Sequence, residues 1–130
     1  MGGGHKGNDH KASAVSSPEE LVDHLANRFL AFDKSPTLAQ AGIYTKAGRE
    51  IRKNTFKNHT LPMLEKAFFD INALSDADAI ILKKMITSLF SLETWQFFRE
   101  SWGVSGAEAA EISSTASRIL IAYFRSSKNK

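Results

Sequence analysis

The clearest hydrophobic pattern in the chain lies between residues 75 and 125, where apolar positions recur every three or four residues. This spacing is typical of amphipathic α-helices, because 3.6 residues make one turn. Ser75, followed by two acidic residues in the next three positions, has the features of a helix start. Apolar positions continue from there to Trp102, so the pattern predicts one long helix over 75–102.

A tight corner follows at residues 102–105, with the sequence Trp-Gly-Val-Ser. Gly103 supplies the left-handed residue that commonly ends a helix. Ser105 and Glu108 have the spacing of a capping box, which begins the next helix at once. We therefore expect a helical hairpin whose second helix continues to Arg125.

The predicted last helix has two faces of apolar or small residues. One face is interpreted as an ordinary core stripe, made of Ile112, Ala116, Ile119, Leu120 and Tyr123. The second face spans about 100° of arc and consists of Ala110, Ser113, Ser114, Ser117, Ile121 and Phe124. The preceding helix repeats the arrangement, with a second face made of Ile80, Thr87, Ser91, Phe98 and Trp102. Small residues let another helix come close, so these second faces predict a homodimer interface.

Three further helices are predicted before the hairpin, over residues 17–33, 35–44 and 49–72. The first two begin with Ser-Pro, a cap followed by a proline whose missing N–H is tolerated in the first turn. Pro62 should kink or split the third helix, because it removes a backbone hydrogen bond and crowds the carbonyl of Asn58. A bent helix can leave a cavity beside the bend. The predicted fold is an all-α bundle of about five helices.

The length of 130 residues predicts one folded domain over 17–126, between a flexible leader (1–16) and a basic tail (127–130). The hydrophobic fraction of 42% and the charged fraction of 24% argue against wholesale disorder. No apolar run reaches the length of a membrane span. The chain has no cysteine and no signal-peptide pattern, which excludes disulfides and thiolate chemistry and favours a cytoplasmic location.

Candidate catalytic chemistry is sparse. The sequence contains no H-E-x-x-H, no glycine-rich phosphate loop and no G-x-S-x-G, so we expect no enzyme activity and no cofactor. His5 and His10 lie in the predicted leader, where no rigid element fixes a metal geometry, so no metal site is predicted. His24 lies beside the apolar face of the first helix and is interpreted as a partly buried hydrogen-bonding residue.

One basic cluster lies in the folded part and consists of Lys46, Arg49, Arg52, Lys53 and Lys57. It has two interpretations. The cluster could hold the phosphates of a nucleic acid or another anionic ligand. A solvated face is favoured, because no exposed aromatic platform or base-reading motif accompanies the charges.

Residues 92–110, with the sequence LETWQFFRESWGVSGAEAA, resemble the end of TetR/AcrR-type transcriptional regulators. In that family an aromatic-rich helix closes on a W-x-x-(F/L)-R…(W/G)-G-(L/V)-S corner before the terminal helix. The order of helices from Ser17 onward is also similar to the family's C-terminal regulatory domain. The family's N-terminal helix-turn-helix is not found in this sequence. The chain is therefore interpreted as an isolated regulatory domain, a fragment of a longer repressor, or a member without DNA binding.

The resemblance implies a homodimer, formed by the last two helices as a four-helix bundle, and a pocket for a small apolar or amphipathic effector. DNA would be bound only through the helix-turn-helix that this sequence lacks. The residues expected near the pocket are Phe29, Phe32, Tyr44, Phe56, Met63, Phe68, Met85, Phe90 and Trp95. For any single one of them, a core position is the more frequent explanation. The alternative function is a helical adaptor that binds a protein partner and has neither ligand nor catalytic activity.

Overall fold

The computed structural model describes residues 15–69 and 74–128, and this part of the chain contains helices without strands. The predicted all-α class is confirmed. The elements are α2 (Pro18–Lys34), α3 (Pro36–Tyr44), α4 (Lys46–Thr55), a π-helical turn η1 (Phe56–Thr60), α5 (Leu61–Phe68), α6 (Asp76–Leu89), α7 (Leu92–Ser101) and α8 (Gly106–Lys128). Because α4, η1 and α5 follow one another without a loop, the described residues form six helices instead of about five.

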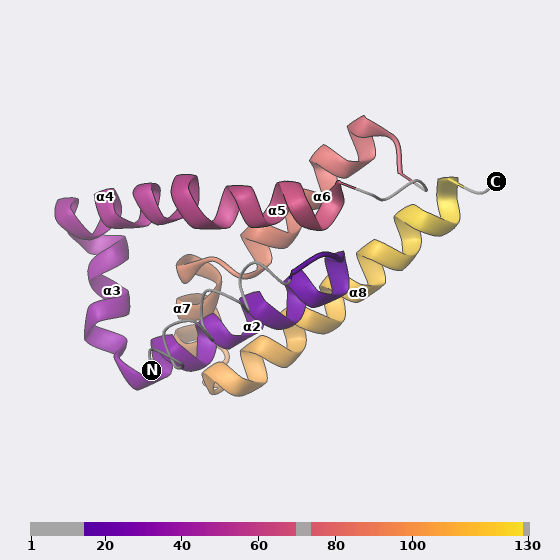
Figure 1. Cartoon of the computed structure of the whole chain (residues 1–130). Helices are drawn as coiled ribbons and strands as arrows, with labels where there is room; N and C mark the ends of the chain where they lie inside the picture. Colours follow the sequence, from indigo (N-terminus) through magenta and orange to yellow (C-terminus); the bar gives the residue numbers. More distant parts are fainter. Residues whose placement is uncertain (1–14, 70–73, 129–130) are drawn as a thin grey trace, which may run out of the picture.

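Helices α2 and α8 lie side by side (Figure 1). Leu21, Leu25 and Phe29 of α2 are fully buried, and so are Ser113 and Ser117 of α8. The small side chains of α8 let the larger side chains of α2 fill the space between the two helices. This pair therefore supplies much of the hydrophobic core.

The start of α8 lies against the end of α2. The Asp33 carboxylate accepts hydrogen bonds from the backbone N–H of Gly106 at 2.6 Å and from Nε1 of Trp95 at 2.9 Å. A Cβ atom at Gly106 would lie 2.6 Å from the carbonyl oxygen of Phe29, which is closer than real Cβ contacts. The absence of a side chain at Gly106 thus permits this close approach.

Pro62 does not interrupt the helical segment, because α4, η1 and α5 follow one another without a loop. Pro62 lies in the first turn of α5, where its missing N–H is tolerated. The preceding turn is a π-helix, in which the N–H of Leu61 donates to the carbonyl of Phe56, five residues earlier. The helix begins at Lys46, three residues before the predicted start, and the predicted stop near Asn72 lies outside the described residues.

The prediction of one helix over 75–102 is wrong, because the chain breaks between α6 and α7 at Phe90 and Ser91. Phe90 leaves the helical conformation, with φ −112° and ψ 19°. The Ser91 hydroxyl accepts a hydrogen bond from the N–H of Thr94 at 3.2 Å and donates to the carbonyl of Ser88 at 2.9 Å. Ser91 therefore caps a new helix by the same chemistry that Ser75 uses at the start of α6.

The corner before α8 has the predicted geometry. Gly103 has φ 65°, and the Ser105 hydroxyl accepts a hydrogen bond from the N–H of Glu108 at 3.1 Å. Both predicted domain limits shift, because Val15 is buried in the core and α8 continues to Lys128. Residues 1–14, with His5 and His10, lie outside the described part.

The two faces of α8 are the reverse of those predicted. The expected core stripe is largely exposed, with Ile119 at 64% and Tyr123 at 63% of full accessibility. The expected interface residues Ala110, Ser113, Ser114, Ser117 and Ile121 are buried inside the chain, and Phe124 is partly buried against the same core. The physical reason is α2, which occupies the small-residue face that was assigned to a second copy.

The other expected interface residues, from α6, α7 and their ends, do not form one surface. Ile80 and Trp102 are exposed, and Phe98 packs partly against the core. Thr87 and Ser91 lie on a cleft on another side of the molecule. The small-residue interface predicted from the sequence is therefore not a free surface of this chain.

Candidate ligand-binding cleft

A cleft of about 1310 Å³ lies between the α4–η1 segment and the α6–α7 junction, with α2 contributing to its wall. In Figure 1, α4 crosses one side of the molecule and is joined to α2 through α3. Side chains of α2 at the cleft are Leu25, Arg28 and Phe32. The opposite walls are formed by Lys46, Arg49, Glu50, Ile51, Arg52, Lys53, Thr55, Phe56 and Thr60, and by Thr87, Ser88, Phe90, Ser91, Leu92, Glu93 and Thr94.

One part of the lining is apolar. Phe32 and Phe90 line the cleft from the body of the molecule, where both rings pack on Phe29 at centroid distances of 6.0 and 5.7 Å. On the facing segment, Ile51 is 66% exposed and Phe56 is 42% exposed. These two side chains expose an apolar surface to the cleft that the described part of the protein does not cover.

The other part of the lining is charged, with five cationic and two acidic side chains. Four of the cations belong to the basic cluster of the sequence, and Arg28 of α2 is the fifth. The remaining member of the cluster, Lys57, is exposed and does not line the cleft. Four members of the cluster are exposed and Arg52 is partly buried, so the cluster is not simply a solvated face.

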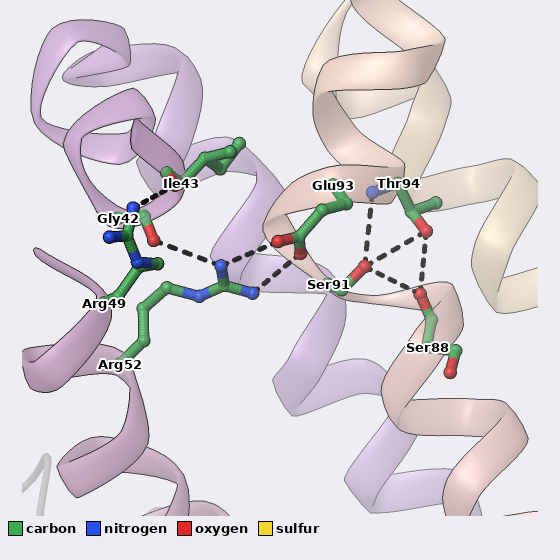
Figure 2. A network of polar contacts seen from close by, with 8 residues as sticks. All are labelled: Gly42, Ile43, Arg49, Arg52, Ser88, Ser91, Glu93 and Thr94. Atoms are coloured by element: carbon green, nitrogen blue, oxygen red, sulfur yellow. Dashed lines mark hydrogen bonds and ion pairs between the residues drawn. The ribbon is translucent and has the colours of Figure 1, made fainter. Parts of the chain in front are cut away.

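Arg52 joins the two walls of the cleft (Figure 2). Its guanidinium binds both carboxylate oxygens of Glu93 on α7, at 2.8 and 2.7 Å, and donates to the carbonyl of Gly42 at 3.1 Å. The hydrogen bonds from Arg52 lower the pKa of the Glu93 carboxyl below its ordinary value. Arg49 donates to the carbonyl of Ile43 beside it. These polar contacts hold α3, α4 and α7 together at one end of the cleft.

Arg28 occupies a different environment. Its Nη2 donates a hydrogen bond to the hydroxyl of Thr60 at 2.6 Å, and Thr60 is buried in the π-helical turn. No carboxylate of residues 15–69 or 74–128 lies within ion-pair distance of Arg28. Burial lowers the pKa of the Arg28 guanidinium, and burial followed by the charge of Arg28 lowers the pKa of His24.

Three of the nine residues expected near a pocket line this cleft, namely Phe32, Phe56 and Phe90. Phe29, Met63, Phe68 and Trp95 are buried in the core instead. Tyr44 is exposed, and its hydroxyl accepts a hydrogen bond from Nε2 of Gln96. Met85 lines a second, shallow groove of about 610 Å³ between α6 and α8. The structure therefore brings three of the nine residues together at one cleft and places the other six elsewhere.

Arg28, Thr60, Ile51 and Glu93 line the cleft and were not predicted as site residues. A signal for Arg28 was present in the sequence. Leu21, Leu25 and Phe32 mark the inward face of α2, and Arg28 falls on the same face three residues after Leu25. A charged residue at a position of this kind is a candidate for a site, because burial of an unpaired charge is unfavourable.

No group of three or more metal-ligating side chains occurs among the residues described by the structure. Across the same residues, none of the helices has the length and hydropathy needed to span a membrane. Comparison of the chain with protein-family models, curated proteins and solved structures found no match. The resemblance to TetR-type regulators thus stays a prediction.

Proposed function

We propose that this chain is a ligand-sensing domain whose cleft binds a small amphipathic molecule. The observation that carries the proposal is the lining of the cleft, where uncovered Ile51 and Phe56 face a cavity that also contains several charged groups. Ligand sites are typically concave and apolar with a few polar groups that fix orientation. The proposal agrees with the sensory role implied by the resemblance to TetR-type regulatory domains.

The wall formed by α4 suits a sensor, because α4 has no buried residue. It connects to the body through α3, through the Arg52–Glu93 ion pair and through α5. A ligand in the cleft would bury Ile51 and Phe56 and give α4 an apolar contact of its own. Binding would therefore stabilise α4 more than the rest of the molecule.

Thermal unfolding in the presence of amphipathic compounds tests the proposal. A ligand at about a hundredfold excess over its Kd should stabilise the folded state by about 2.7 kcal/mol and raise Tm. The Phe56→Ser variant should lose most of this shift. The matched control is Leu38→Ser on α3, because Leu38 is 75% exposed and does not line the cleft. An equal shift in both variants, or no shift with any compound, would contradict the proposal.

The second candidate function is homodimerisation through the exposed face of α6 and α8. Large apolar side chains gather there, with Ile81, Met85, Ile112, Ile119 and Tyr123 all exposed, beside the groove of about 610 Å³. An apolar face along two neighbouring helices suits a two-fold interface with a second copy, in which each patch contacts its own equivalent. This proposal keeps the homodimer predicted from the sequence but places its interface on the face of α8 opposite the small-residue face.

Sedimentation equilibrium over a wide concentration range tests the dimer. The wild-type chain should be dimeric, and Ile119→Asp should be a folded monomer. Thr115→Asp is the control, because Thr115 is exposed on the same helix and does not line the groove. A monomeric wild type at all concentrations would exclude the homodimer and leave the adaptor function, with a different protein partner, as the alternative for this face.

A further inference from the structure

We infer that the polar end of the ligand is an anion, a carboxylate or a phosphate, which binds Arg28 while the apolar part of the ligand lies against Phe32 and Phe56. The inference depends on the proposed function of the cleft and specifies its ligand class as amphipathic acids. Three observations support it, and they concern the partners of the arginines, the environment of Arg28 and the balance of charge in the cleft.

The first observation comes from the six arginines of the chain, all of which the structure describes. Arg52, Arg99, Arg118 and Arg125 each have a carboxylate partner within 4 Å. Among the described residues, Arg28 and Arg49 have no such partner, and both line the cleft. Within this part of the chain, the guanidinium groups without a carboxylate are thus concentrated at one cavity.

The second observation is the environment of Arg28. A guanidinium carries five N–H donors, and the structure records one acceptor for that of Arg28, the Thr60 hydroxyl. Burial already disfavours its charge. A ligand anion at this position would accept charge-assisted hydrogen bonds in a partly desolvated site, where such bonds are stronger than at an exposed surface.

The third observation is that positive charge and apolar surface occur in the same cavity. Five cationic side chains face two acidic ones, and one of the acids, Glu93, is already paired with Arg52. Ile51, Phe56 and Phe32 offer nothing to a free inorganic anion, whereas an alkyl or aryl group would bury them. The combination favours one molecule that has an anionic head and an apolar body.

Isothermal titration of the wild-type chain with decanoate, decyl phosphate and decanol tests the inference, because the three probes share one alkyl chain and differ in the head group. At least one anionic probe should bind about tenfold or more tightly than decanol, as expected for a charge-assisted hydrogen bond. The comparison of decanoate with decyl phosphate then identifies which head group fits. The preference should weaken at high salt concentration.

The variant that isolates the head-group site is Arg28→Met, which keeps an unbranched apolar side chain and removes the charge. It should bind decanol as the wild type does and lose the preference for the anionic probes. Its stability without ligand should change little, because removal of a partly desolvated cation is offset by loss of the hydrogen bond to the buried Thr60 hydroxyl. Arg118→Met is the matched control, because Arg118 pairs with Asp23 and does not line the cleft.

The outcomes separate the two proposals. If decanol binds as tightly as both anionic probes, or if Arg28→Met retains the preference, the anion site is disproved and the apolar cleft remains. If none of the three probes binds, the cleft is not a site for amphipathic molecules and both proposals fail. Loss of the preference in both Arg28→Met and Arg118→Met would indicate a non-specific effect of net charge and would also disprove the anion site.

Discussion

Helices α8 and α4 differ in how they are held, although both carry many polar residues. Helix α8 buries Ala109, Ser113 and Ser117 completely against the rest of the chain. Helix α4, with the sequence KAGREIRKNT, has no buried residue. Small side chains therefore fix α8 by packing, whereas α4 is fixed by a tight corner, a few polar contacts and the continuing helix after it.

The difference explains why the cleft lies beneath α4. Short helices are marginal on their own, and most helical stability in proteins comes from packing of an apolar face. Two neighbouring features fix the position of α4. One is α5, which continues the helix and has four buried side chains, Met63, Leu64, Ala67 and Phe68. The other is the tight corner at Gly48, where a Cβ atom would lie 2.1 Å from the carbonyl oxygen of Ala41. Between these anchors the helix leaves its apolar side chains free for a ligand.

The largest expected effect comes from placing a charge on the packed face of α8. Ser117→Arg should lower the free energy of unfolding by about 3–5 kcal/mol, because it buries an unpaired charge at a fully buried position. Ile51→Arg on α4 is the matched variant and should change the free energy of unfolding by no more than about 0.5 kcal/mol. Urea unfolding followed by circular dichroism measures both. A stable Ser117→Arg monomer would mean that this face of α8 is an interface after all.

A smaller effect is expected when the polar contact between α4 and α7 is removed. Glu93→Gln should lower global stability by only about 0.5–1 kcal/mol, because the Arg52–Glu93 pair is partly exposed to solvent. Hydrogen exchange should nevertheless accelerate for the amides of α4 and stay unchanged for those of α8. Glu100→Gln, an exposed change on α7 like Glu93→Gln, should affect neither the global stability nor the exchange of the α4 amides. Uniform acceleration in both helices would show that α4 does not open separately.

The same contact should depend on pH in a defined direction. The pKa of Glu93 is lowered in the folded state from its ordinary value of 4.5, chiefly by the hydrogen bonds from Arg52. A lowered carboxyl pKa stabilises the fold above the unfolded-state value, and this stabilisation is lost as pH falls through the folded-state value. The protection factors of the α4 amides, which correct exchange for its intrinsic slowing at low pH, should therefore fall as the pH falls below about 4.5, and Glu93→Gln should remove this part of the loss.

Local chemistry predicted much of the helical framework. The starts at Ser17 and Ser75 and the left-handed residue at Gly103 need only a few neighbouring residues, and all three are present in the structure. Ser91 was missed because the apolar spacing continues across the break between α6 and α7, so that its capping role is hidden within a helical pattern. Pro62 indicated a local disturbance of the helix, but the sequence did not predict the π-helical turn that precedes it.

The local sequence of α8 does not show which of its two faces packs inside the chain. Both faces of α8 suit a neighbouring helix, and the fold places α2 on the small one, which leaves Ile119 and Tyr123 outside. The cleft was difficult to predict for the same reason, since it requires Arg28, Phe56 and Glu93 to converge from three separate helical segments. Phe56 was expected near a pocket, and Arg28 had a signal as a charged residue in line with Leu21 and Leu25, but neither signal shows that the two side chains line the same cleft as Glu93.

The smallest expected effect tests the packing of α8 most finely. The hydroxyl groups of Ser113 and Ser117 are buried, and neither has a hydrogen-bond partner in the described part of the chain. A buried hydroxyl without a partner is unfavourable, so Ser113→Ala should raise the free energy of unfolding by about 0.5 kcal/mol. The same substitution at Ser91 should lower it by about 1 kcal/mol, because the cap of α7 is lost. Chemical denaturation measures this difference in sign. If Ser113→Ala is destabilising, the hydroxyl contributes to the contact with α2, and the close approach of the two helices does not depend on small size alone.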